Sequence, residues 1–224
     1  MAIVTASSPV LANTTCPVQV GDSDRLAAID GDVRLAFIDS HLARASRQAR
    51  IWTWGWGFGI GVATVGNLVP LAFVSPSNRI DWYTGAATTV VGIVPLVIAP
   101  LDVIHDAREL HAELGASSEA DLCRVLAGAE KRLARDASNQ ADGQRWWLHP
   151  ANVLLNTGVG LFLALGYRHW AAGVFNAVGG SAIGELIILT QPTRSIEDLR
   201  RYRSGDLDDG PSRVRAGLGY ARAF

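Results

Sequence analysis

Long apolar runs separated by charged stretches constrain this chain more than any other feature. Four segments hold a single charged side chain among them, Glu185, and they cover residues 54–74, 82–101, 151–167 and 170–190. At about 1.5 Å per residue such runs match a hydrocarbon layer of about 30 Å, and the third is the shortest. The sequence therefore predicts an all-α polytopic membrane protein with four transmembrane helices.

The composition agrees with this assignment. Hydrophobic residues make up 49% of the chain and charged residues 18%, which is a low charged fraction for a soluble protein of this size. The formal net charge is −1, so the chain lacks the basic excess of a nucleic-acid-binding protein. We expect the lipid bilayer, not a nucleic acid, to be its surrounding partner.

The tryptophans mark the predicted membrane boundaries. Indole rings favour the interface, where the ring is half buried and its N–H stays hydrated. All seven lie at ends of the apolar segments: Trp52, Trp54, Trp56, Trp146 and Trp147 would mark one boundary, and Trp82 and Trp170 the other.

The distribution of basic residues predicts the orientation. Residues 1–53 hold five Lys and Arg, 102–150 hold six and 191–224 hold seven, while the turns near Arg79 and Arg168 hold one each. Loops rich in Lys and Arg stay on the cytoplasmic side. We therefore expect both termini in the cytoplasm, with the chain in the plasma (inner) membrane.

Cys16 and Cys123 fall in the predicted cytoplasmic parts. Thiols stay reduced there, and two cysteines do not define a disulfide framework, so we expect both to be free. Residues 1–21 are predicted to be a disordered tail because they are rich in Ser, Thr and Pro. Residues 201–224 are predicted to be a cytoplasmic C-terminal tail.

Four sequence matches in the same order predict an internal duplication. L-A-x5-L-A-R begins at Leu35 and again at Leu126; S-x-Q-A begins at Ser46 and Ser138; W-x-x-G-x6-G begins at Trp82 and Trp170; P-x-x-x-I-x-D-x-R begins at Pro100 and Pro192. The offsets are 91, 92, 88 and 92 residues. The units are 22–108 and 109–200, each with a cytoplasmic helical region and a membrane hairpin. Because two spans return the chain to its starting side, the two units are predicted to be parallel.

The cytoplasmic parts of the two units carry apolar side chains at helical spacing. These are Leu26, Ile29, Val33 and Phe37 in the first unit, and Leu122, Val125, Leu126, Ala129 and Leu133 in the second. The sequence predicts amphipathic helices that pack on one another. The alternative is that these helices lie on the membrane surface. Anionic lipid favours a basic polar face for that role, whereas the polar faces of these helices mix acids with arginines.

Glycines within the spans predict close helix packing, since a missing side chain lets two backbones approach. The candidate packing residues are Gly57, Gly61, Gly85, Gly92, Gly173, Gly180 and Gly184.

Glu185 is the candidate functional residue, because an ionisable group within a span is costly and faces a partner, a bundle interior or water. Asn67, Asn152, Asn156 and Asn176 are polar side chains within the spans that offer partners. Glu185, Asn156 and Asn176 therefore define a candidate ion or substrate pathway. A structural hydrogen bond between helices is the alternative.

No catalytic or cofactor signature is present. The acids and histidine at Asp102, His105, Asp106 and Glu109 share one helix face, but the second unit does not repeat them, so we expect a solvated face and no metal. The leading hypothesis is a non-enzymatic membrane scaffold or assembly subunit that pairs with itself or another membrane protein. A small oligomeric pore or transporter is the alternative, and a lipid-modifying membrane enzyme is a more remote one.

Overall fold

The computed structural model describes residues 15–21, 24–98 and 101–208, and this part of the chain is helical without any strand. The α-helices are α1 (Asp24–Ala27), α2 (Gly31–Leu68), α3 (Arg79–Ile98), α4 (Val103–Ala116), α5 (Leu122–Asp142), α6 (Leu148–Leu161), α7 (Trp170–Thr190) and α8 (Arg194–Ser204). Short 3₁₀ turns cover Val69–Ala72, Pro76–Asn78 and Glu119–Asp121, and a π-helical turn at Phe162–Gly166 extends α6.

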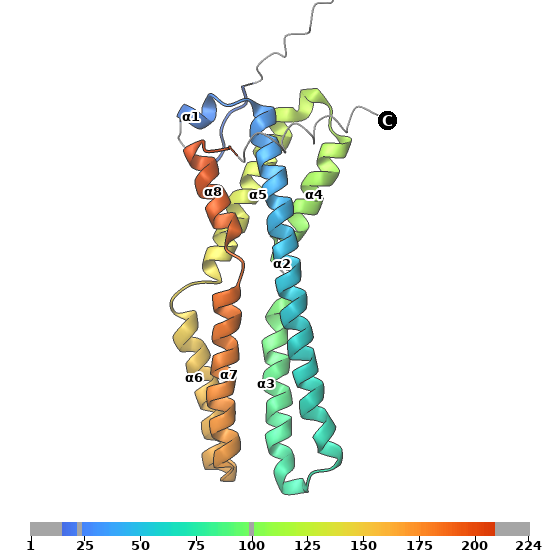
Figure 1. Ribbon diagram of the computed structural model, residues 1–224, viewed down its shortest axis with the longest axis vertical. Coiled ribbons are helices and arrows are strands. Elements are labelled where there is room, and N and C mark those ends of the chain that lie inside the picture. The colour runs from blue at the N-terminus through green and yellow to red at the C-terminus, as the bar shows by residue number, and fades with distance from the viewer. Residues whose placement is uncertain (1–14, 22–23, 99–100, 209–224) are drawn as a thin grey trace, which may run out of the picture.

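The molecule is elongated, with a helical head at one end and two helical hairpins at the other (Figure 1). The head contains α1, the first half of α2, α4, α5 and α8. The second half of α2 lies against α3, and α6 lies against α7. The two hairpins are therefore built from consecutive segments of the chain.

Three helical stretches are apolar and long enough to cross a membrane: Gly31–Ala72, Leu148–Gly166 and Trp170–Ser204. They contain three of the four predicted spans, and the prediction of an all-helical membrane protein is confirmed to this extent. The segment predicted as the second span forms α3, which is not among the three. Residues 99–100 of that segment lie outside the described residues.

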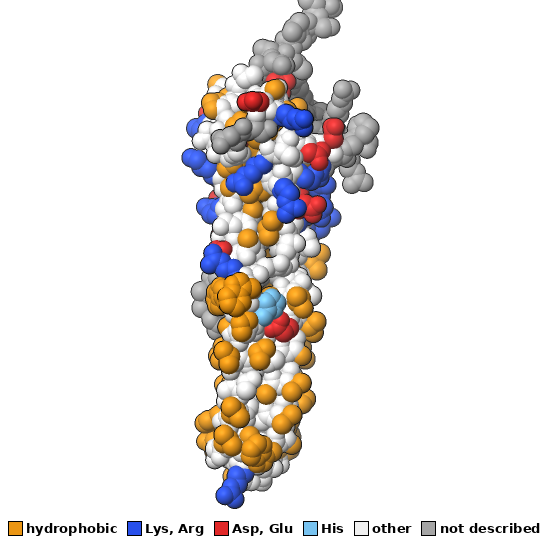
Figure 2. Space-filling view, turned by 90° about the vertical axis from the view of Figure 1, so that its left-hand side faces the viewer, with side chains coloured by type: hydrophobic (Ala, Val, Ile, Leu, Met, Phe, Trp, Pro, Cys, Tyr) orange, Lys and Arg blue, Asp and Glu red, His pale blue; other side chains and the backbone are white. Residues whose placement is uncertain are grey.

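The surface of the two hairpins differs from that of the head. Lys, Arg, Asp and Glu side chains gather over the head, while apolar side chains cover most of the lower part (Figure 2). Phe58, Phe73 and Phe175 are among the large apolar residues of the hairpins that are at least three-quarters exposed. Exposure of these large apolar side chains is unfavourable in water, whereas a hydrocarbon layer accommodates it.

The head has a conventional apolar core. It includes Leu26, Phe37, Ile38, Leu42, Leu110, Leu126, Leu133 and Tyr202, all of them at most 3% exposed. The predicted stripe on α5 packs into this core. The predicted stripe before the first span does so only in part, because α1 ends at Ala27 and α2 begins at Gly31, so its members do not share one helix. Val33 is 43% exposed, and Arg34 is buried beside it.

The expectation of free thiols is wrong, because Cys16 and Cys123 form a disulfide across 107 residues of sequence. The bond ties residues 15–21 to the first turn of α5. We call residues 15–21 the N-terminal strap. Val18 and Val20 of the strap pack against the head core, and Gly21, with a φ of +110°, lies against the side chain of Arg203.

The connections between head and hairpins differ on the two sides of the molecule. Helix α2 runs from the head into the first hairpin as one helix of 38 residues. On the other side, residues 143–147 separate α5 from α6, and residues 191–193 separate α7 from α8. One hairpin thus continues a head helix, while the other is joined through non-helical links at both of its ends.

Candidate functional site

Glu185 lies in the last two turns of α7, close to the head, and its carboxylate is held by two residues of α6. Nδ1 of His149 lies 2.5 Å from its Oε2, and Nδ2 of Asn152 donates to its Oε1 at 2.9 Å. The side chain of Glu185 is 27% exposed and that of His149 37% exposed. This cluster therefore sits at the edge of the second hairpin, near the head, with partial access from outside.

The polar side chains continue along α6 by one further helical turn. Asn152 Nδ2 also donates to the carbonyl oxygen of Ser181, and Asn156 Nδ2 donates to the carbonyl and side-chain oxygens of Asn152, each at 2.9 Å. His149, Asn152 and Asn156 follow the spacing i, i+3, i+7 and share one helix face. That spacing places His149 on the same face as the two asparagines, and it is the one sequence signal for a residue that sequence reasoning did not assign to this cluster.

The remaining candidate residue, Asn176, does not join the Glu185 cluster. Its Nδ2 donates to the carbonyl oxygen of Ala172 at 3.0 Å, within its own helix. Asn67 behaves in the same way and donates to Ala63 at 2.8 Å. Among the asparagines proposed as partners for Glu185, Asn152 contacts it directly, and Asn156 is one hydrogen bond further away.

Glycines of α7 make room for this row of asparagines. A Cβ atom at Gly184 would lie 2.0 Å from Oδ1 of Asn152, and one at Gly180 would lie 2.1 Å from Oδ1 of Asn156. Farther from the head, a Cβ at Gly173 would meet the carbonyl oxygen of Gly160 at 2.5 Å. The contact between α6 and α7 therefore depends on the missing side chains.

The other predicted packing glycines divide into two groups. Gly85 lies against Asn67 across the first hairpin, and Gly92 approaches Ile60 more loosely, at 4.0 Å for an added Cβ. Among the described residues, Gly57 and Gly61 have no atom within 4 Å of an added Cβ. Gly61 instead lines a shallow apolar hollow of about 590 Å³ on α2.

The two hairpins are tied to each other at both ends. Near the head, Nε1 of Trp52 and Nε1 of Trp56 donate to Oγ1 of Thr190 at 3.2 and 3.0 Å. At the far end, Nδ1 of His169 lies 2.6 Å from Oδ1 of Asp81, which joins α3 to the start of α7.

The head core holds a buried charged network at its far side from the hairpins. Arg34 forms an ion pair with Glu130, and its guanidinium also donates to the hydroxyl of Tyr202 at 2.9 Å and to the carbonyl oxygen of Cys16 at 2.8 Å. The hydroxyl of Tyr202 donates to Glu130, and the backbone N–H of Gln19 donates to the other carboxylate oxygen at 2.5 Å. Arg34 and Glu130 are fully buried, so these bonds replace water for both charges.

A second pair of buried polar groups lies closer to the hairpins. Nδ1 of His41 is 2.6 Å from Oδ1 of Asp198, and the ring of His41 stacks on Phe37.

The carboxyl of Asp136 is buried, with neither oxygen hydrogen-bonded to a described residue. Burial, together with the negative charge of Asp106, raises the pKa of Asp136 to about 8.

On the α4 face predicted to be solvated, Asp102, His105 and Glu109 are exposed and Asp106 is buried, and three of the four contact α5. Arg135 donates to both carboxylate oxygens of Asp106 at 2.5 and 2.6 Å, and Arg132 lies 3.7 Å from Glu109. Asp102 accepts a hydrogen bond from Asn139. Within the described residues, no group of three or more His, Cys, Asp or Glu side chains is placed to hold a metal ion.

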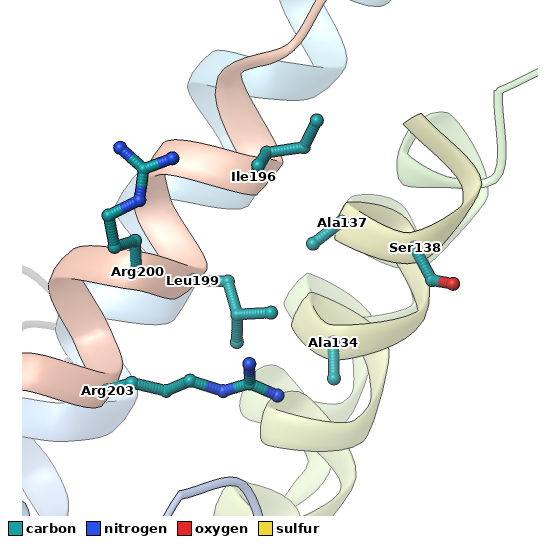
Figure 3. Close-up of a pocket in the computed structure, with 7 residues that line it drawn as sticks. All are labelled: Ala134, Ala137, Ser138, Ile196, Leu199, Arg200 and Arg203. Atoms are coloured by element: carbon teal, nitrogen blue, oxygen red, sulfur yellow. The ribbon is translucent and has the colours of Figure 1, made fainter. Parts of the chain in front are cut away.

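A hollow of about 420 Å³ lies between parts of the packed helices α5 and α8 (Figure 3). Its floor is apolar, and it is lined by Ala134, Ala137, Ser138, Ile196, Leu199, Arg200 and Arg203. Figure 3 shows the side chain of Arg203 crossing beneath Leu199 toward Ala134, while Arg200 points away.

In comparisons with protein-family models, curated proteins and solved structures, nothing matches this chain.

Proposed function

We propose that this protein is a non-enzymatic integral membrane scaffold or assembly subunit that pairs with a second copy or with another membrane protein. The observation that carries the proposal is the open face of α2. In the second hairpin, Gly173, Gly180 and Gly184 lie directly against a neighbouring helix, whereas no atom of the described part of the chain lies within 4 Å of a Cβ added at Gly57 or Gly61. A glycine-lined hollow within an apolar span favours the close approach of another helix.

The same proposal includes four spans arranged as two parallel repeats. Asp81 and His169 precede the matching Trp82 and Trp170, so they occupy equivalent positions, 88 residues apart, and they contact each other. Contact between equivalent residues is expected where they lie on a two-fold axis. The geometry at the far end of the hairpins thus supports an axis running between them, along the membrane normal.

Contacts in the head give independent support for the repeat. Asp106 of α4 and Asp198 of α8 are equivalent in the fourth sequence match. Asp106 binds Arg135 of the second unit, and Asp198 binds His41 of the first. Each acid therefore crosses from its own unit to the opposite one, as a two-fold relation requires.

The proposed orientation has both termini and the head in the cytoplasm, in a plasma (inner) membrane. It is supported by the 18 basic residues in the three predicted cytoplasmic segments against the single arginines at the two far turns. Single cysteines placed near Asn78 and near Arg168 should react with a membrane-impermeant thiol reagent added outside. Reaction of a cysteine placed at Ser117 instead would reverse the orientation.

Assembly through the α2 face is tested by the mass of the detergent-solubilised complex. Gly61→Leu fills the hollow with a branched side chain and should reduce the mass of the complex or remove its partner. Gly59→Leu is the matched control, since a Cβ at Gly59 also meets no described atom within 4 Å but Gly59 does not line the hollow. If both variants, or neither, change the assembly, the α2 face is not the interface.

The second candidate is a small oligomeric pore or transporter with Glu185 in its pathway. The observation in its favour is the continuous polar row from Glu185 through Asn152 to Asn156, beside a partly exposed His149. Glu185→Gln should then assemble normally yet lose ion or proton flux in reconstituted vesicles. Equal flux for the variant and the wild type would remove this candidate.

A further inference from the structure

The structure joins two facts that separately point in different directions. The arginine distribution favours a cytoplasmic head, where thiols are kept reduced. Yet Cys16 and Cys123 are close enough to be bonded, with their Cα atoms 5.2 Å apart. Disulfides of cytosolic proteins are usually transient and redox-sensing or catalytic. We propose that Cys16 and Cys123 form a reversible redox site that latches the N-terminal strap to the head; this rests on the orientation proposed above.

The two cysteines differ in exposure, and this difference assigns their roles. Cys16 is 4% exposed, whereas Cys123 is half-buried and lies in the first turn of α5. The first turn of a helix favours negative charge because its backbone N–H groups point outward along the axis. Cys123 is therefore the sulfur that meets an external reagent, and Cys16 is the internal partner.

Oxidation by a peroxide proceeds through Cys123. Its thiolate attacks one peroxide oxygen, an S–O bond forms, the O–O bond breaks, and hydroxide leaves and takes up a proton as water. The Cys16 thiolate then attacks the Cys123 sulfur, an S–S bond forms, and the S–O bond breaks with loss of a second water. Two thiols lose two electrons, and one hydrogen peroxide becomes two water molecules.

Reduction by a dithiol also begins at Cys123, the more exposed cysteine. An external thiolate attacks Sγ of Cys123, and Cys16 leaves as the thiolate. The second thiol of the reductant then resolves the mixed disulfide, releasing Cys123 and the oxidised reductant. Burial protects Cys16 from direct attack.

The latch matters because the strap covers the buried charged network. The carbonyl oxygen of Cys16 accepts from Arg34, and the N–H of Gln19 donates to Glu130. In the reduced protein these two hydrogen bonds, with the packing of Val18 and Val20, hold the strap without a covalent bond. Each opening of the strap then exposes the Arg34–Glu130 pair to water.

The first experiment follows the thiols in cells that express the full chain. Acid quenching and alkylation should find both cysteines reduced in unstressed cells, bonded to each other after brief peroxide exposure, and reduced again on recovery. A disulfide that persists in unstressed cells would overturn the redox site. Failure of peroxide to form the bond would also overturn it.

The second experiment tests the assigned roles and the latch. In Cys16→Ser, peroxide should leave a sulfenic acid on Cys123 that a selective probe labels, whereas Cys123→Ser should leave Cys16 unlabelled. In purified wild type, reduction should speed amide hydrogen exchange in residues 16–20 by at least about tenfold, with α6 and α7 unchanged. Equal labelling of the two variants, or unchanged exchange in the strap, would refute the proposal.

These outcomes are separate from those that test assembly. The effect of Gly61→Leu on complex mass is measured at a distant site on α2 and does not depend on the thiols. The impermeant-reagent assay at the far turns likewise reports the orientation alone.

Discussion

Arg34→Met removes the charge of one partner from a fully buried ion pair and should markedly destabilise the head. In the wild type the guanidinium donates to Tyr202 and Cys16 and is paired with Glu130. The variant leaves the Glu130 carboxylate at full burial with the Tyr202 hydroxyl and the Gln19 N–H as its hydrogen-bond donors. Breaking a buried pair in this way costs about 3–5 kcal/mol, because one charge stays in a poorly solvating interior.

The double variant separates the cost of an orphaned charge from the value of the pair. Arg34→Met with Glu130→Met removes both charges and keeps much of the volume, so it should cost less than the two single variants together, although the Tyr202 hydroxyl, the Cys16 carbonyl and the Gln19 N–H lose hydrogen-bond partners. The coupling free energy between the two positions should then exceed about 1 kcal/mol in the double-mutant cycle.

The free energy of unfolding of the head is measured by pulse proteolysis across a urea series, in mild detergent. Arg124→Met is the matched control, because Arg124 pairs with Asp121 on the surface of the same head, and its loss should not change the midpoint measurably. If Arg34→Met lowers the free energy of unfolding no more than this control, or if the two positions do not couple, the buried Arg34–Glu130 pair does not stabilise the head as argued above.

Three further outcomes follow from particular side chains. The pKa of Asp136 is raised to about 8 in the folded head and is about 4 in an unfolded chain. This carboxyl therefore stabilises the head at acidic pH, and that stability is lost as the pH rises from about 4 to about 8. Asp136→Asn should flatten this pH dependence of the free energy of unfolding, measured in urea titrations. Gly173→Ala places a Cβ 2.5 Å from the Gly160 carbonyl and should lower the thermal midpoint of the second hairpin by overpacking worth about 1–3 kcal/mol, while Gly92→Ala should be tolerated. Glu185→Leu should lower that midpoint more than Glu185→Gln, since glutamine still bonds to both α6 partners; equal midpoints would show that these bonds contribute nothing.

The helical class and the positions of the apolar segments could be predicted from the sequence, because both depend on local composition and periodicity. The apolar stripe on α5 was predicted for the same reason and packs into the head core. The four-span count and the parallel repeat remain predictions. The count of four requires α3 to span the membrane. The repeat relies on the contact between Asp81 and His169, and only the sequence match suggests that these two positions are equivalent.

The errors and omissions involve contacts between residues far apart in sequence. The Cys16–Cys123 bond spans 107 residues, so local sequence does not reveal that the two cysteines lie together. The expectation of free thiols rested only on the predicted cytoplasmic location. Arg34 is a charged residue that local pattern assigns to the surface, but Glu130 and Tyr202 arrive from α5 and α8 to bury it. For the candidate site, Glu185 and Asn152 could be identified as polar exceptions in apolar spans, while the choice of His149 required the register between α6 and α7.

Because α2 is continuous, the first hairpin is joined stiffly to the head, whereas the second hairpin is joined flexibly. Its 38 residues form a rod of about 57 Å at about 1.5 Å per residue, so a rotation of the head must tilt the first hairpin by the same angle. The second hairpin is joined by residues 143–147 and 191–193, whose backbone torsions absorb such a rotation. A change in bilayer thickness would accordingly be taken up by tilting of the α6–α7 hairpin about the hydrogen bonds from Trp52 and Trp56 to Thr190, and this tilt would break the contact between His169 and Asp81 at the far end.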